Sequence, residues 1–368
     1  MDTKHILFAD DDEAPRDLFR DAVNEWNEAN QPRQFVADYA STVEDAQAKL
    51  KLTRFDCALF DLRLPSIGGG KPLPAGGNDL AQAGLQDSGV PVAIITATVD
   101  DVDRDRPGHG LLEAFYKGAG TPYADALSWF ADQWDLMDTL ASVRGRMRVS
   151  GAETFVRRIW PSWQDYKRKL GTEDQLTAVV TRQYATHIAE LLGMDGDANP
   201  AWHPFENFIS PALLEHRAHT GDIFTFGEQL WVVLSPQCDM TVGKIDDVLL
   251  AYCDRAGLQN WTEKVAALSA VPPGQALSSS LAKYFTGLVN QTEPSKHFLP
   301  PLGPGGPLYV DFKKLMTKPL ADLNSEAGLA TRVGSVAPAF LPNLTQRFGS
   351  YMSRPGQPNI DISHFADP

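Results

Sequence analysis

The stretch His5-Ile6-Leu7-Phe8-Ala9-Asp10-Asp11-Asp12-Glu13 decides the fold of this chain, because an apolar run ends there in four acidic residues. A second apolar run, Asp56-Cys57-Ala58-Leu59-Phe60, ends in Asp61. As strands of one parallel sheet, both runs would deliver their acids to its carboxyl edge, where open α/β sheets bind ligands. Carboxylates clustered in this way are typical ligands of a hard divalent cation such as Mg²⁺.

Two more chemical groups are expected at the same edge. The run Val90–Ile95 has the length and composition of a fully buried strand and leads to the hydroxyl of Thr96. A last strand at Phe115–Tyr116 would lead to the ammonium group of Lys117. Acids, a hydroxyl and a lysine therefore converge in this prediction.

These groups suit phosphoryl transfer to a carboxylate. Asp61 would attack the phosphorus as a nucleophile that is already ionised. Mg²⁺, held by Asp11, Asp61 and the backbone carbonyl of Arg63, would neutralise the phosphoryl oxygens. The Thr96 hydroxyl and the Lys117 ammonium would bind the remaining oxygens.

In the order and spacing of these residues, positions 4 to about 125 resemble the receiver domain of two-component response regulators. The segments that carry the resemblance are Ile6–Glu13, Leu59–Pro65, Ile95–Ala97 and Lys117. The resemblance implies a flavodoxin-like, doubly wound, five-stranded parallel sheet and a cognate histidine kinase or another phosphodonor as partner. It also assigns roles: acidic pair Asp10 and Asp11, phosphoacceptor Asp61, switch hydroxyl Thr96 and phosphate-binding lysine Lys117.

Three departures from the receiver pattern concern the output surface. Receivers usually have a proline directly after the lysine, where this chain has Gly118, and an aromatic switch residue a few positions before it, where this chain has Ala114. Two aromatic residues, Phe115 and Tyr116, nevertheless stand next to that position in the sequence. The segment Ser66–Gly77 also makes the loop after the phosphoacceptor longer than usual. We therefore expect intact phosphorylation chemistry and an altered output surface.

The acidic run also has a simpler interpretation. Asp and Glu favour the first turn of a helix, so Asp10–Glu13 could be only a solvated helix start. In that case the domain is a degenerate receiver that serves as an interaction module.

Composition limits the class of protein further. The 368 residues, 43% of them hydrophobic, are ample for two cores and exceed one receiver by more than 200 residues. Three cysteines, Cys57, Cys238 and Cys253, show no paired spacing, which favours a reducing cytoplasm over a disulfide framework. We expect neither a signal peptide nor a membrane span. A net charge of −14 opposes general binding to nucleic acid.

The rest of the chain divides by pattern. We predict a receiver over 1–125, a helical connector over 126–200, and an α+β effector domain of unknown type over 201–368 that contains a small barrel-like β unit. Helices are expected at 13–26, 42–52, 123–140, 152–170, 173–192 and 339–352, with Thr42 as a cap and a turn over 193–200. Further strands are expected at 34–40, 246–252 and 308–312, with a hairpin over 221–235.

The sharpest local signature in the effector domain is Leu234–Met240, which contains Cys238 and Asp239. With His203, His216 and His219 upstream, it suggests a Cys-His nucleophile, or a zinc site that lacks a clear fourth ligand. A single cysteine at a strand exit is more often a small buried hydrophobe, and an aspartate there often holds a turn.

Basic residues alternate with aromatics over residues 144–169. Such a segment can bind a nucleic-acid strand or an acidic partner, although the solvated face of a connecting helix is the commoner explanation. No helix-turn-helix is recognisable. The leading hypothesis is a signalling switch in which phosphorylated Asp61 controls the effector domain through a protein partner. The alternatives are a receiver-controlled hydrolase or nuclease and a nucleic-acid effector. The oligomeric state stays open.

Overall fold

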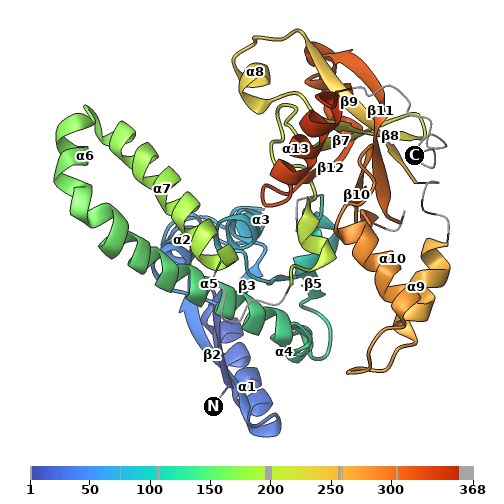
Figure 1. Ribbon diagram of the computed structural model, residues 1–368. Helices are drawn as coiled ribbons and strands as arrows, with labels where there is room; N and C mark the ends of the chain where they lie inside the picture. The colour runs from blue at the N-terminus through green and yellow to red at the C-terminus, as the bar shows by residue number, and fades with distance from the viewer. Residues whose placement is uncertain are drawn as a thin grey trace, which may run out of the picture. The chain divides into compact units, whose positions relative to one another are not determined.

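The computed structural model describes residues 2–74, 76–105, 108–194, 201–255, 258, 260–303 and 306–355. The chain divides into two units, Met1–Asn199 and Pro200–Pro368. Each unit has its own β-sheet (Figure 1). The finer division into a receiver over 1–125 and a connector over 126–200 stays a prediction.

The first unit contains five parallel strands in the order β2-β1-β3-β4-β5. Its elements are β1 Asp2–Ala9, α1 Glu13–Ala29, β2 Arg33–Ala40, α2 Val43–Leu52, β3 Cys57–Asp61, α3 Gly76–Gln82, β4 Val92–Thr96, β5 Leu112–Tyr116 and α4 Pro122–Asp132. The predicted five-stranded, doubly wound parallel sheet is therefore confirmed. The strands β1 and β3 lie side by side, so both acidic strand ends reach the same part of the carboxyl edge.

Helices cover both faces of this sheet, because side chains alternate along each strand. On β1, Ile6 and Phe8 pack with buried residues of α1, α4 and α5 Trp134–Thr154. The intervening Leu7 and Ala9 pack with buried residues of α2 and α3. The predicted Thr42 cap is present, because its side chain accepts a hydrogen bond from the backbone N–H of Asp45.

Between β4 and β5 the described part of the chain forms only short 3₁₀ turns, η2 Val99–Asp101 and η3 His109–Leu111. The sequence Pro107-Gly108-His109-Gly110 predicts a short or displaced helix in this region, because proline and glycine interrupt helices. The long helix predicted over 123–140 is instead two helices, since α4 ends at Asp132 and α5 begins at Trp134.

Beyond α5 the first unit continues as helices. A π-helical turn, η4 Phe155–Ile159, and a 3₁₀ turn, η5 Trp160–Ser162, interrupt the helix predicted over 152–170 at Trp160-Pro161, where the proline in the sequence predicts a break. They lead to α6 Trp163–Lys169 and α7 Glu173–Met194, and α7 lies alongside α5 (Figure 1). Of the turn predicted over 193–200, residues 195–200 lie outside the described residues.

The second unit contains a seven-stranded sheet in the order β10-β11-β9-β8-β7-β12-β6, with antiparallel neighbours throughout. Its strands are β6 Phe208–Ile209, β7 Asp222–Phe226, β8 Gln229–Val233, β9 Asp247–Asp254, β10 Lys296–Leu299, β11 Leu308–Pro319 and β12 Arg332–Val336. Its helices are η7 Pro204–Asn207, α8 Gln237–Thr241, α9 Trp261–Ser269, α10 Ser279–Val289, α11 Leu320–Leu323, α12 Glu326–Ala330 and α13 Leu341–Met352.

The predicted α+β architecture and the hairpin β7–β8 are confirmed, but the β unit is not a barrel. The described strands form an open sheet whose edges are β10 and β6, and a barrel would require these edges to pair with each other. One face packs against α13 and the other against buried residues of α8 and α11. The described residues contain no helix that is long and apolar enough to span a membrane.

Candidate functional site

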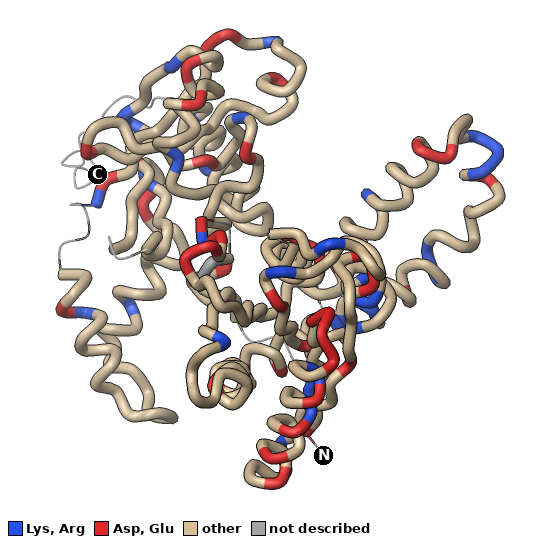
Figure 2. The backbone as a smooth tube through the Cα atoms, turned by 180° about the vertical axis from the view of Figure 1, so that it is seen from behind, with Lys and Arg blue, Asp and Glu red and all other residues tan. Residues whose placement is uncertain are grey.

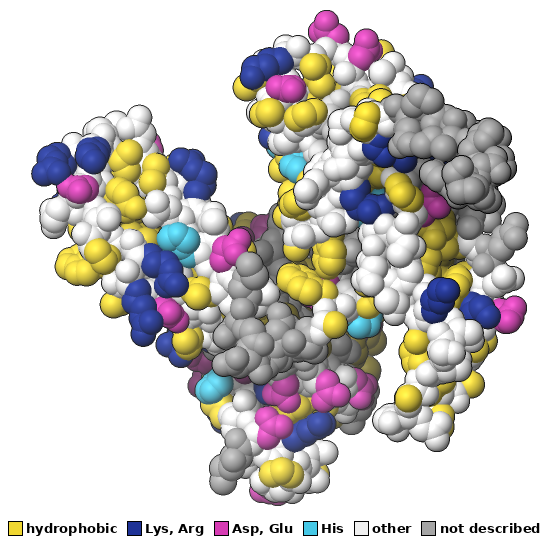
Figure 3. All heavy atoms as spheres, in the orientation of Figure 1, with side chains coloured by type: hydrophobic (Ala, Val, Ile, Leu, Met, Phe, Trp, Pro, Cys, Tyr) yellow, Lys and Arg dark blue, Asp and Glu magenta, His cyan; other side chains and the backbone are white. Residues whose placement is uncertain are grey.

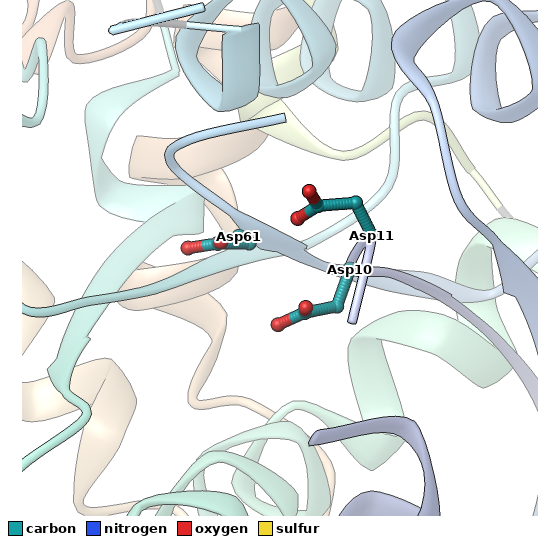
Figure 4. A group of neighbouring side chains, drawn as sticks. All are labelled: Asp10, Asp11 and Asp61. Atoms are coloured by element: carbon teal, nitrogen blue, oxygen red, sulfur yellow. The ribbon is translucent and has the colours of Figure 1, made fainter. Parts of the chain in front are cut away.

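Three aspartates meet at the carboxyl edge of the first sheet. Parallel pairing sets Ala9 beside Phe60, so the next residues, Asp10 and Asp61, come level with each other. One carboxylate oxygen from each of Asp10, Asp11 and Asp61 lies within 4.8 Å of the other two. Figure 4 shows the three carboxylates pointing to the same side of the strand ends. Asp10 and Asp61 are buried, with 1% and 8% of their surface exposed.

Lys117 supplies the positive charge of this acid cluster. It follows β5, and its Nζ lies 3.0 Å from Asp10 Oδ2 and 3.1 Å from Asp61 Oδ2. Its backbone N–H donates to the Thr96 carbonyl at 2.8 Å, which fixes the chain at the point where the side chain turns inward. One ammonium group against three carboxylates leaves two negative charges in excess.

The pKa values reflect this excess and the burial of the site. Burial raises the pKa of Asp10 and of Asp61, and the attraction of Lys117 only partly offsets the effect. Burial alone would lower the pKa of Lys117, but the two neighbouring carboxylates raise it above its ordinary value. The lysine therefore stays charged, and the aspartates ionise at a free-energy cost.

The predicted hydroxyl is placed at the end of β4. Thr96 is buried, and its Oγ1 accepts a hydrogen bond from the Thr98 backbone N–H at 3.0 Å. This contact uses an acceptor lone pair, so the Thr96 O–H keeps its capacity to donate. Arg63 follows Asp61 in the loop, and its backbone N–H lowers the pKa of the Asp61 carboxylate. The metal-binding role of the Arg63 carbonyl stays a prediction.

Glycines in this region have packing reasons that the sequence did not reveal. The predicted loop Ser66–Gly77 ends in the first residues of α3, and Gly77 donates its N–H to the Leu62 carbonyl at 2.9 Å. A Cβ at Gly77 would lie 2.4 Å from the Asp61 carbonyl oxygen, so no larger residue fits without a shift of the backbone. Helix α3 can therefore rest directly on the strand end that carries Asp61.

The departure at Gly118 also has a structural cause. A Cβ at this position would lie 2.5 Å from the Cε1 atom of Tyr116. The ring of Tyr116, a half-exposed residue, occupies the space that a side chain at 118 would need. The sequence shows that the usual proline is missing, but only the structure shows that the Tyr116 ring occupies its place.

Two residues near the acid cluster were not singled out from the sequence. Arg16 on α1 donates from Nη1 to the Asp10 carbonyl at 2.7 Å and to the Asp11 carbonyl at 3.4 Å, which braces the acidic loop. Tyr123 on α4 packs against Phe8, with ring centroids 5.9 Å apart. Burial raises the pKa of Tyr123 to about 12, with Asp10 contributing, so its hydroxyl stays neutral. The position of Arg16 one turn into a helix after the acids was the available signal.

The residues present fit a small hard cation. The three carboxylates are oxygen ligands of the kind that Mg²⁺ prefers, and they lie close enough to share one ion. A divalent cation would also balance the two excess negative charges that Lys117 leaves. No second group of three His, Cys, Asp or Glu side chains within ligand reach of one another occurs in the part of the chain that the structure describes.

The effector candidates Cys238 and Asp239 lie at the start of α8. Cys238 is exposed, and its Sγ lies 3.6 Å from Asp239 Oδ1. Asp239 lies 3.8 Å from Lys244. His219 is held by its own chain, with Nδ1 2.7 Å from the Thr220 carbonyl. Among the described residues, no contact joins a histidine to Cys238. His216, His219 and Cys238 also do not form a metal site there. Catalysis at Cys238 and Asp239 stays a prediction.

The basic segment over 144–169 is partly engaged within the first unit. Arg144 donates to the Ser88 and Gly89 carbonyls at 2.6 and 2.7 Å, and Arg157 and Arg158 lie near Glu153. Lys and Arg residues gather at the far end of the hairpin that α5, α6 and α7 form (Figure 2). Hydrophobic side chains lie between them on the face seen in Figure 3. Nucleic-acid binding here stays a prediction.

The strand order, the helices on both faces and the acids at the carboxyl edge define a domain with the receiver fold over roughly the first third of the chain. Solved receiver domains match the same third. The chemotaxis response regulator CheY4 of Vibrio cholerae is 18% identical, with a TM-score of 0.27, and covers 34% of this chain and 97% of its own. A CheY-like receiver domain protein from Methanospirillum hungatei is 19% identical, with a TM-score of 0.26, and covers 37% and 98%.

A third match is the receiver domain of the sensor histidine kinase PA1611 from Pseudomonas aeruginosa, whose structure has a magnesium ion coordinated in the active-site cleft. It is 18% identical, with a TM-score of 0.27, and covers 36% of this chain and 97% of its own. No family model matches the chain, and no curated protein does. The assignment of the fold therefore rests on the strand order and the site of this chain, and the second unit has no assigned relative.

Proposed function

We propose that this protein is a signalling switch whose receiver domain accepts a phosphoryl group on Asp61 and thereby controls the α+β unit through contacts with a protein partner. The donor is a histidine kinase or a small acyl phosphate. The observation that carries the proposal is the acid cluster: three carboxylates within 4.8 Å of one another, faced by the single ammonium of Lys117.

The proposed transfer makes one bond and breaks one bond at phosphorus. A carboxylate oxygen of Asp61 attacks, the bond from phosphorus to the donor nitrogen or oxygen breaks, and an acyl phosphate forms on Asp61. The leaving group keeps the bonding electron pair and takes a proton from solvent. Attack by water on the same phosphorus later releases inorganic phosphate and restores the Asp61 carboxylate.

The residues of the cluster divide the work. Asp10, Asp11, Asp61 and the Arg63 carbonyl would hold Mg²⁺, which when bound supplies the charge neutralisation that the phosphoryl oxygens need. Lys117 already lies 3.1 Å from Asp61, so its ammonium can stabilise charge that develops on the transferred group. The O–H of Thr96 can donate to a phosphoryl oxygen while its acceptor bond from Thr98 stays in place.

A change in the Lys117 contacts is the proposed origin of the signal. The ammonium now bridges Asp10 and Asp61, and a phosphoryl group on Asp61 would compete for it. The backbone N–H of Lys117 donates a hydrogen bond to the Thr96 carbonyl, so a displacement of one residue would also displace the other. The altered surface formed by Tyr116 and Gly118 lies on either side of Lys117 in the chain. This surface is the expected start of the route to the output.

Acetyl phosphate with Mg²⁺ tests the proposal. Intact-mass spectrometry should show one added phosphoryl group on the wild type and none on Asp61→Asn. The matched control is Asp12→Asn, which removes an exposed member of the same acidic run that lies outside the acid cluster and should still be phosphorylated.

Two results would contradict the proposal. Equal phosphorylation of Asp61→Asn would show that another residue is the phosphoacceptor. A wild type that gains no phosphoryl group from acetyl phosphate or from a phosphorylated kinase, and is not stabilised by Mg²⁺, would identify a degenerate receiver that serves as an interaction module.

A further inference from the structure

The second unit contains a cavity of about 500 Å³ that the proposed function does not use. It lies among the segment 202–207, the end of α10, the edge strand β10 and helix α13. We call it the His297 pocket. The lining residues that matter for its chemistry are Trp202, Asn207, His297, Phe340, Asn343 and Arg347.

Unsatisfied polar atoms concentrate at the His297 pocket. In the described residues, six buried side-chain nitrogen or oxygen atoms have no hydrogen-bond partner, and three of them, Asn207 Oδ1, His297 Nδ1 and Arg347 Nε, belong to its lining residues. Each such atom costs about 1–3 kcal/mol when buried without a partner. Native structures keep few groups of this kind, so three of them at one cavity need an explanation, and a ligand that pairs with them would supply one.

Arg347 brings an uncompensated positive charge to the pocket. Its Nη2 donates to the carbonyls of Glu293 and Lys296 at 2.8 and 2.9 Å, which anchors α13 beside β10. No carboxylate lies within 4.0 Å of its guanidinium group in the described part of the chain, and burial lowers its pKa. None of the described residues that line the pocket is Asp or Glu, although the chain carries a net charge of −14. An anionic group would therefore be favoured here.

His297 adds a neutral hydrogen-bonding group. It is 3% exposed, and burial, together with the nearby Arg347 charge, lowers its pKa to about 3. At neutral pH its ring is uncharged, with one donor and one acceptor nitrogen. The Asn207 Oδ1 atom is an acceptor, and the Arg347 Nε atom is a donor. A ligand that satisfies these three atoms must itself carry both donors and acceptors.

Aromatic side chains form the apolar wall of the pocket. Trp202 and Phe340 meet edge to face, with ring centroids 5.4 Å apart. Phe298 also lines the cavity, and 46% of the Trp202 surface is exposed, so part of this residue is accessible to a ligand. A planar ring that packs against such side chains gains binding free energy from burial and aromatic contacts. A cavity of this volume accommodates a small molecule.

We propose that the His297 pocket binds a small molecule that joins a planar ring to an anionic group. The ring packs against Trp202 and Phe340, the anion pairs with Arg347, and polar atoms on the ring edge bond to Asn207 and His297. Nucleotides and aromatic carboxylates share this chemistry. The site lies within the second unit, so the proposal does not depend on phosphorylation of Asp61.

Calorimetric titration of the full chain with two sets of probes tests the proposal. One set is AMP, GMP, CMP and UMP with the matching uncharged nucleosides, and the other is benzoate and indole-3-acetate with the matching amides. We expect saturable binding of one molecule per chain by at least one anionic probe, and binding weaker by about tenfold or more for its uncharged counterpart. The set that binds distinguishes a phosphate from a carboxylate as the natural anion.

Two exposed residues on α13 provide a matched pair of variants. Asn343→Asp adds a negative charge at the pocket, and Gln346→Glu adds the same charge to an exposed residue outside its lining. Asn343→Asp and Trp202→Ala should each weaken binding by about tenfold or more, while Gln346→Glu should leave it unchanged. Circular dichroism checks that each variant is folded.

Three outcomes would overturn the proposal. The first is the absence of saturable binding for both sets of probes at millimolar concentrations. The second is equal binding of an anionic probe and its uncharged counterpart, which would remove the role of Arg347. The third is equal weakening by Asn343→Asp and Gln346→Glu, which would place the bound molecule elsewhere.

Discussion

Replacement of Asp61 by asparagine should stabilise the first unit in the absence of Mg²⁺. Asp61 faces two carboxylates within 4.8 Å, and each repels it by about 3.5 kcal/mol at an effective dielectric constant of about 20. The Lys117 ammonium at 3.1 Å attracts the Asp61 carboxylate by about 5 kcal/mol at the same dielectric constant. Repulsion and attraction therefore nearly offset each other, with a difference of about 2 kcal/mol. The cost of burying the charge, which is the largest cause of the raised pKa of Asp61, adds to the repulsion. We expect Asp61→Asn to add about 1–2 kcal/mol to the free energy of unfolding at pH 7.

The sign of the pH dependence follows from the raised pKa of Asp61. Its folded pKa lies above its unfolded value, so the stability linked to the protonated form is present at low pH and is lost as the pH rises through the folded pKa. The gain from Asp61→Asn should therefore appear at neutral pH. It should vanish below the ordinary carboxyl pKa of about 4, where the wild-type carboxyl is protonated in both states.

Hydrogen exchange of the β1 and β3 amides in the full chain measures this effect within the first unit. In EDTA at pH 7 these amides should exchange about 5 to 30 times more slowly in Asp61→Asn than in the wild type. Asp87→Asn, which neutralises an exposed carboxylate outside the cluster, is the control and should leave exchange unchanged. Mg²⁺ should protect the wild type and protect Asp61→Asn less. Faster exchange in Asp61→Asn without Mg²⁺ would refute the reasoning, because it would show that the attraction of Lys117 for Asp61 outweighs both the cost of burying the charge and the repulsion between the carboxylates.

Three further predictions concern residues around the cluster. Lys117→Met should destabilise the first unit by about 3 kcal/mol in EDTA, because it leaves the buried carboxylates without their cation. Urea unfolding at pH 7 measures this loss, and an unchanged unfolding midpoint would contradict the prediction. Gly77→Ala should cost about 2 kcal/mol or more in the same assay, because the new Cβ meets the Asp61 carbonyl at 2.4 Å. Gly118→Ala should cost less than about 1 kcal/mol, because the ring of the half-exposed Tyr116 can turn away. NMR of the tyrosine side chains should show this movement of the ring. A loss of stability as large as that of Gly77→Ala would contradict this prediction.

The elements of the receiver fold were predictable because their signals are local. The residues Ile6–Ala9 and Val92–Ile95 are buried on both faces of their strands. A strand of this kind appears in the sequence as a continuous apolar run, so it can be recognised without knowing which strands pair with it. The Thr42 cap is equally local, since the contact spans three residues. The candidate site followed from one rule, namely that parallel strands end at a common edge.

The second unit was harder because its decisive features are non-local. The hairpin β7–β8 was predicted from its turn, but β12 pairs with β6 and β7, more than 100 residues earlier in the chain. No local pattern encodes such a pairing, so the sequence suggested a barrel where the structure has an open sheet. No motif in the sequence indicates the His297 pocket either, because its lining residues are spread from 202 to 347.

The sequence by itself determined that acids, a hydroxyl and a lysine stand at the ends of strands in the first third of the chain. Only the tertiary structure decided how their charges balance: Asp10 and Asp61 are buried, Lys117 bridges them, and two negative charges remain in excess. It also decided that Gly77 and Gly118 are constrained by an adjacent carbonyl and an adjacent ring. The physical reason is that strand propensity depends on neighbours along the chain, whereas electrostatic energy and steric fit depend on distances that only folding sets.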